Sequence, residues 1–226
     1  MLGKTHKYVG ACCGIIATEQ IIQAPITPEK IILGGMLISG SMIGALLLDI
    51  DHTGSTMGKK HPFISKITNF LFGHRGVTHA PLIWISLTLL LFYLNIIIPN
   101  LIRLLFVASF CCFTIYSFLK FVLKKLNISK SKNIIISAIL SIGGAYYLST
   151  LGNDFLKTTF TFIILGIFIG AISHIFLDSF NPSGTPWLLP FSKKRFKFAK
   201  LSEKTGIIFD IIFTVLVCIN TYFLIM

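Results

Sequence analysis

Charged residues are scarce in this sequence, and their scarcity excludes an ordinary soluble domain. Asp, Glu, Lys and Arg make up 12% of the 226 residues, against about 25% in a typical soluble domain. Acidic residues are the rarest, eight in all, whereas Lys and Arg number 20 and hydrophobic residues reach 54%. With a mean hydropathy of +0.83, the chain is predicted to be a polytopic membrane protein.

Several motifs of known chemistry are also missing. No HExxH segment is present, which argues against a membrane metalloprotease. A metal-free lipid phosphatase with a histidine nucleophile is a closer alternative, because "SHIFLD" and "NPSGT" echo its signature, but their order is wrong and no PSGH segment exists. The five cysteines form neither a CxxC site nor a disulfide framework, so we expect small core residues.

Long apolar runs predict an all-α bundle of about seven transmembrane or re-entrant helices, in a single domain over residues 1–226. The runs are 8–23, 31–48, 81–98, 104–122, 134–151, 158–177 and 207–226. The first is short and polar at Glu19 and Gln20, so an interfacial helix, or a signal peptide that begins with Lys4 and Lys7, is an alternative.

Basic residues predict the orientation of this bundle. With a cytoplasmic N-terminus, all of the 20 basic residues except Lys30, Arg103 and Lys157 fall on the cytoplasmic face. The net charge of +12 then indicates attraction to anionic lipid headgroups and not nucleic-acid binding. We expect a bacterial inner-membrane protein with its functional side in the cytoplasm.

Candidate ligands gather on the same predicted face, because all six histidines and three aspartates fall there. His174 and Asp178 are four residues apart on a helix and therefore project from one side. Asp49 and Asp51 end an apolar run, where an ionised carboxylate is costly unless a cation compensates it. Single residues have simpler interpretations: a boundary aspartate in water, or a polar turn at 74–79. The joint clustering favours a metal or catalytic site.

Four segments in order carry a family resemblance: "THKYVG", "LLLDIDH", "HRGVTHAP" and "SHIFLDSFNPSGTPWLLPFSKKR". Together they resemble the LexA-regulated, membrane-bound metal-dependent hydrolase family of the YdjM type, which is grouped with the zinc-dependent phospholipase C and P1 nuclease enzymes. The resemblance implies hydrolysis of a phosphate ester with one or two divalent ions, zinc or alternatively manganese. The implied ligands are His6, Asp49 or Asp51, His52, His74, His79, His174 and Asp178.

On this hypothesis, a metal-activated water attacks the phosphorus atom. Asp49 is expected to accept the proton of the water, and Arg75 to contact a phosphate oxygen with its planar fork. Asn181 is expected to contact the substrate or a ligand. A metal or proton transporter is the main alternative, but transport favours ionisable groups near mid-membrane, where only Glu19 and Asp210 fall.

Two further segments concern lipids. "PFISKITNFLFG" places apolar side chains on one helical stripe, the pattern of a helix that lies in the membrane interface. "WLLPFSKKRFKFAK" alternates basic residues with phenylalanines, a composition that attracts anionic headgroups. Both segments predict membrane lipids as partners, either as an anchor or as the source of the substrate.

Overall fold

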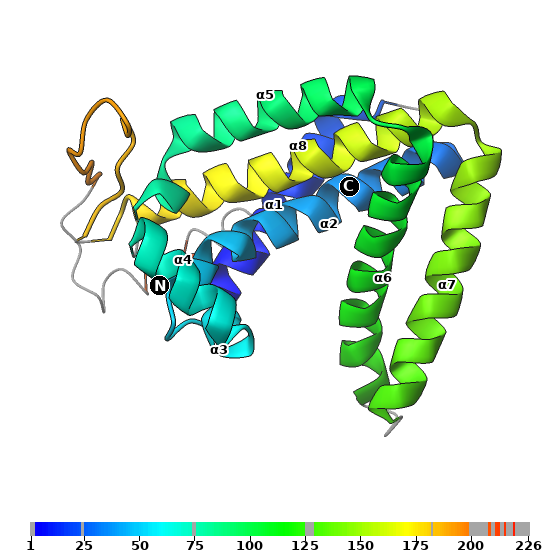
Figure 1. Ribbon diagram of the computed structural model, residues 1–226, viewed down its shortest axis with the longest axis horizontal. Helices are drawn as coiled ribbons and strands as arrows, with labels where there is room; N and C mark the ends of the chain where they lie inside the picture. Colours follow the sequence, from blue (N-terminus) through cyan, green and yellow to red (C-terminus); the bar gives the residue numbers. More distant parts are fainter. Residues whose placement is uncertain are drawn as a thin grey trace. The chain divides into compact units, whose positions relative to one another are not determined.

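The computed structural model describes residues 3–23, 25–73, 76–124, 129–181 and 183–198, with isolated residues between 208 and 219. These residues form eight α-helices and two short 3-10 helices, η1 and η2 (Figure 1). The bounds are α1 Gly3–Ile21, α2 Pro28–Leu47, η1 Leu48–Asp51, α3 Thr56–Lys60, α4 Pro62–Phe72, η2 Val77–His79, α5 Pro81–Ile97, α6 Asn100–Lys124, α7 Lys130–Thr150 and α8 Asn153–Asp178.

The all-α class is confirmed, and helices occupy the first six predicted runs. Within the described residues, four helical segments are long and apolar enough to cross a membrane: Pro28–Asp51, Asn100–Lys120, Ser131–Thr150 and Asn153–Asp178. Helix α5 is apolar but shorter. The seventh predicted run, 207–226, lies outside the described residues apart from five isolated positions. Seven spans and a cytoplasmic N-terminus therefore stay predictions.

The chain divides into two compact units, residues 1–91 with 162–226, and residues 92–161. In the first unit, α1 and α2 form a close antiparallel pair. Helix α2 begins at a favourable cap, because Thr27 accepts a hydrogen bond from the Lys30 amide and Pro28 occupies the first turn. The hydroxyl of Ser41 donates to the Gly10 carbonyl at 2.6 Å, which joins the two helices.

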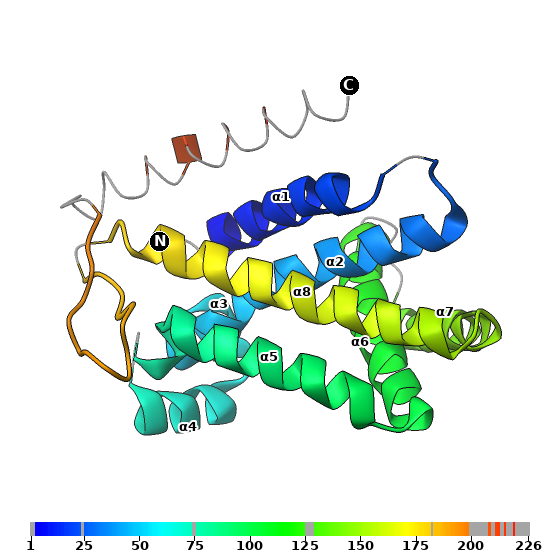
Figure 2. The ribbon, with the colours of Figure 1, turned by 90° about the horizontal axis from the view of Figure 1, so that it is seen from above.

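Helices α2 and α8 lie side by side (Figure 2). Glycines on both helices allow an even closer backbone approach than that of α1 and α2. Gly40 on α2 lies against Gly166 on α8, Gly44 lies against the backbone of Ile167, and Gly170 lies against the backbone of Ser41 and Ala45. Both helices thus use a small-xxx-small spacing. A Cβ atom on Gly170 would lie only 1.9 Å from the Ser41 carbonyl oxygen, which leaves room for no larger residue. This contact sets the C-terminal half of α8 directly against the C-terminal half of α2.

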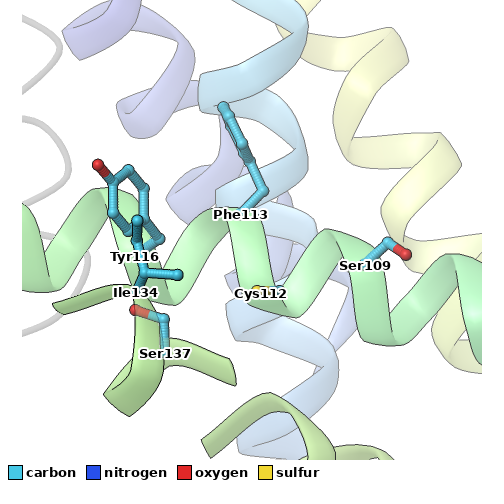
Figure 3. A pocket seen from close by; sticks show the side chains of 6 residues that line it. All are labelled: Ser109, Cys112, Phe113, Tyr116, Ile134 and Ser137. Atoms are coloured by element: carbon cyan, nitrogen blue, oxygen red, sulfur yellow. The ribbon is translucent and has the colours of Figure 1, made fainter. Parts of the chain in front are cut away.

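In the second unit, α6 and α7 pair as a helical hairpin. A groove of about 490 Å³ opens between them, lined by Ser109, Cys112, Phe113, Tyr116, Ile134 and Ser137 (Figure 3). The guanidinium of Arg103 is fully buried and donates to the Asn95 side chain at 2.8 Å and to the carbonyls of Asn95 and Ile98 at 2.6 and 3.1 Å. Arg103 thus satisfies carbonyl groups that the end of α5 leaves unpaired.

Candidate metal centre

Five polar side chains meet in the interior of the first unit, where α1, η1, η2 and α8 end or begin. Each is at most 2% exposed. They are His6 from α1, Asp51 from η1, His79 from η2, and His174 and Asp178 from α8. Burial of this many ionisable groups is costly unless they compensate one another or hold an ion. The structure therefore brings five of the predicted ligands into one cluster.

The carboxylate of Asp178 lies at the centre of the cluster. Its oxygens are 3.6 Å from Nε2 of His6, 3.3 Å from Nε2 of His79 and 3.7 Å from Nε2 of His174. Asn181 donates a hydrogen bond from its side-chain amide to Asp178 Oδ1 at 2.9 Å. This bond holds the carboxylate plane in one orientation, so Asn181 orients Asp178, which lies three residues earlier in the chain.

The His174 ring is fixed in one tautomer by the backbone of α2. Its Nδ1 lies 2.6 Å from the Ala45 carbonyl oxygen, and a carbonyl can only accept, so Nδ1 carries the proton and donates. The lone pair of the neutral ring is then on Nε2, the atom that faces Asp178. A histidine that donates one ring N–H to a carbonyl and offers the other nitrogen is the usual arrangement of a metal ligand.

His6 stacks on His174, with the ring centroids 3.8 Å apart and an interplanar angle of 17°. Burial, followed by repulsion from His174 whenever that ring is protonated, keeps the pKa of His6 well below its ordinary value, so the His6 ring is neutral at pH 7. Its Nδ1 is buried and has no hydrogen-bond partner among the residues that the structure describes. The Nε2 atom of His6, which faces Asp178, is the ring nitrogen placed to bind an ion in the cluster.

His79 lies between the two carboxylates of the cluster. Its Nδ1 is 3.2 Å from Asp51 Oδ2, and its Nε2 faces Asp178. Burial alone would lower the pKa of His79, but the hydrogen bonds with Asp178 and Asp51 outweigh it and raise the pKa to about 8. Thr78 donates its hydroxyl to the same Asp51 oxygen at 2.5 Å. Its carbonyl in turn accepts from the Trp84 indole at 2.8 Å, so this turn is held on both sides.

The donor set fits a divalent metal ion. Ligand atoms of His6, His174 and Asp178 all lie within 4.8 Å of one another. Donors that share one tetrahedral zinc ion at about 2.0–2.2 Å lie about 3.3–3.6 Å apart. The Nε2 atom of His6 is 3.6 Å from Asp178 Oδ1 and that of His174 is 3.7 Å from Asp178 Oδ2, both close to this range. Two imidazole nitrogens and a carboxylate oxygen form a mixed set that suits zinc.

Other predicted site residues lie elsewhere. Asp49 is half-buried and interacts electrostatically with His174, Asp178 and His79, so it borders the cluster. His52 is exposed on the surface. His74 and Arg75, predicted as a ligand and a phosphate contact, lie outside the described residues.

Three contributors to the site were not predicted from the sequence. The Ala45 carbonyl and the Thr78 hydroxyl orient ligands, but a backbone acceptor and a turn threonine carry no distinctive pattern. The paired GxxxG segments at 40–44 and 166–170 are visible in the sequence, and their spacing was a usable signal for close helix packing.

The fold and the site define a class of protein: an all-helical membrane protein with a buried histidine–aspartate cluster. The chain matches the YdjM inner membrane protein family over residues 1–225, and it belongs to that family.

Two curated relatives match shorter segments of the chain. YvsG of Bacillus subtilis is 34% identical over 80 residues, which are 35% of this chain and 44% of YvsG. The inner membrane protein YdjM of Escherichia coli is 32% identical over 99 residues, 42% of this chain and 47% of YdjM. The matched segments thus span less than half the length of either relative. No solved structure matches the chain.

Proposed function

We propose that the protein is a membrane-bound, metal-dependent hydrolase that cleaves a phosphate ester of a lipid or similar substrate at the cytoplasmic membrane face. The observation that carries this proposal is the convergence of three buried imidazoles on one buried carboxylate, Asp178. Regulation by LexA and kinship with the zinc-dependent phospholipase C and P1 nuclease enzymes belong to the same proposal, and the motif resemblance supports them.

His6, His174 and Asp178 are the residues that would hold the ion, and their chemistry favours zinc, with manganese as the alternative. A zinc ion supplies two effects when bound: it lowers the pKa of a water molecule toward about 7, and it polarises phosphoryl oxygens. Neutral His6 and the fixed tautomer of His174 prepare both rings to bind without first losing a proton.

Proton transfer falls to the other residues of the cluster. His79 holds a proton between Asp51 and Asp178 at neutral pH, so it is placed to donate that proton to a leaving oxygen. Asp49, half-buried at the edge of the cluster, is the carboxylate that remains available as a base. Arg75 keeps its proposed role as the phosphate contact, since its planar fork suits phosphate oxygens.

Metal content measured by mass spectrometry on detergent-purified protein is the direct test. Wild type is compared with His174→Ala and with His61→Ala, a matched control that removes an exposed histidine from the α3–α4 junction. We expect stoichiometric zinc or manganese in wild type and His61→Ala and its loss in His174→Ala, with phospholipid hydrolysis following the metal. Metal without turnover would indicate a metal-binding protein or transporter. Absence of metal from folded wild type would contradict the proposed site.

A further inference from the structure

Helix α4 turns its polar side toward the protein and its apolar side outward. Ser65 is fully buried, and half-buried Asn69 donates its side-chain amide to the Asp51 carbonyl at 2.7 Å. On the opposite side of the helix, Phe63 and Phe70 are 75% and 88% exposed. A helix that packs on a soluble core has the reverse arrangement, with its apolar side inward. The outward side of α4 therefore requires an apolar partner.

The exposed side is a continuous stripe, and we call it the α4 stripe. Its members are Phe63, Ile64, Ile67, Phe70 and Leu71, each 43% exposed or more. Contiguous apolar patches of this kind on a protein surface mark contacts with membranes or with other proteins. Eleven residues of helix extend about 16 Å, too short to cross a hydrocarbon core of about 30 Å. Helix α4 thus has the length and the surface of a helix that lies along a membrane.

Charge distinguishes between the two kinds of partner. Lys59 and Lys60 end α3, Lys66 lies on α4 itself, and all three are exposed. Two copies of the chain joined through the α4 stripe would bring these like charges together, which opposes association. An anionic lipid leaflet offers both the complementary charge and the apolar depth that the stripe requires.

We propose that α4 is an interfacial lipid-binding helix, whose stripe enters the acyl-chain boundary of an anionic leaflet while its lysines contact the headgroups. Helix α4 lies at the periphery of the first unit, beside α3 (Figures 1 and 2). Its inward contact from Asn69 ties this lipid-facing helix to the backbone of Asp51. Lipid binding here requires neither a metal ion nor hydrolysis, so it can be tested independently of the proposed activity.

Tryptophan fluorescence in proteoliposomes measures where the stripe lies. Phe70→Trp places a reporter at the most exposed large hydrophobic residue of α4, and wild type supplies the background from Trp84 and Trp187. We expect the added emission to be quenched by lipids brominated near the glycerol end, and less by lipids brominated near the chain terminus. Quenching by aqueous iodide instead would overturn the proposal. Protection from both quenchers would also overturn it, because a second copy would then cover the stripe.

The charge component is tested with the same reporter, by comparing brominated phosphatidylglycerol with brominated phosphatidylcholine. One lysine near the headgroups should favour the anionic lipid by up to about fivefold. Lys66→Gln should therefore reduce the preference for phosphatidylglycerol severalfold. The matched control Lys157→Gln, which removes one exposed charge from the second unit, should leave it unchanged. Equal preferences in the two variants would refute the assignment of the headgroup contact to α4.

Discussion

Replacement of Gly170 by alanine is expected to separate α2 from α8 and to disrupt the candidate metal centre at the same time. The new Cβ would lie 1.9 Å from the Ser41 carbonyl oxygen and 2.7 Å from the Ala45 nitrogen. Both are backbone atoms, so no side-chain rotation relieves the clash. Because Cβ contacts below 3.0 Å essentially never occur, the helices must move apart by about 1.1 Å.

That movement is large compared with the geometry of the site. The bond from His174 Nδ1 to the Ala45 carbonyl, now 2.6 Å, would lengthen to about 3.7 Å and cease to be a hydrogen bond. Overpacking costs about 1–3 kcal/mol and the lost hydrogen bond about 1 kcal/mol, so the free energy of unfolding should fall by about 2–4 kcal/mol. Metal affinity should fall as well, because the tautomer of His174 is no longer fixed.

Unfolding monitored by circular dichroism in detergent, together with zinc titration, checks both effects. Gly35→Ala is the matched control, because Gly35 lies on α2 with nothing within 4 Å of a new Cβ. Alanine there should be neutral or stabilising by up to about 1 kcal/mol, as expected for an exposed helical position. If Gly170→Ala proved as stable as Gly35→Ala and bound zinc equally well, the close packing of α2 and α8 would not be what positions His174.

Three further outcomes are expected. Asp178→Ala should weaken zinc binding far more than Asp49→Ala, by more than about 100-fold in an equilibrium titration, because three imidazoles face Asp178 whereas Asp49 only borders the cluster. The pKa of His79 is raised from its ordinary value of 6.5 to about 8 in the folded protein, so protonated His79 stabilises the fold fully below pH 6.5. Metal-free wild type should therefore lose this stability as the pH rises through about 8. Thermal unfolding scans should show a flatter pH dependence for His79→Gln. Arg103→Met should lower the free energy of unfolding by about 2–4 kcal/mol, and Arg103→Lys should restore little of it, because an ammonium cannot reproduce the planar fork that reaches two carbonyls and the Asn95 side chain.

The helices could be predicted from the sequence because each apolar run is long and its ends carry polar residues or turn formers. Hydropathy also indicated α4, where the spacing of Phe63, Ile67 and Phe70 makes a stripe. The short helices η1, α3 and η2 were not predicted, because they follow from tertiary contacts and not from periodicity. Ser55, for example, caps α3 and also donates to the Asp49 carbonyl.

The residue types of the candidate site could be predicted from the sequence, but not which of the candidate residues meet in the cluster. Placement of histidines and aspartates at helix ends on one side identified His6, Asp51, His79, His174 and Asp178 as candidates, and the structure brings these together. The same argument placed His52 with them, yet its side chain is exposed. The order of apolar runs in the sequence predicts on which side of the membrane a residue lies, but not the direction in which a turn points its side chain. That direction depends on contacts such as those of Thr78 and Trp84 with their neighbours.

The cluster draws its members from residue 6 to residue 178, and this span has a consequence for biogenesis. During synthesis His6 leaves the ribosome long before His174 and Asp178, so His6 lacks these two neighbours until α8 has been made. No earlier intermediate contains the His174–Asp178 pair, so no intermediate can present the complete ligand set to a metal ion. Capture of the proposed ion would therefore require synthesis to pass Asp178, and a chain truncated before His174 would lack two of the three ligands.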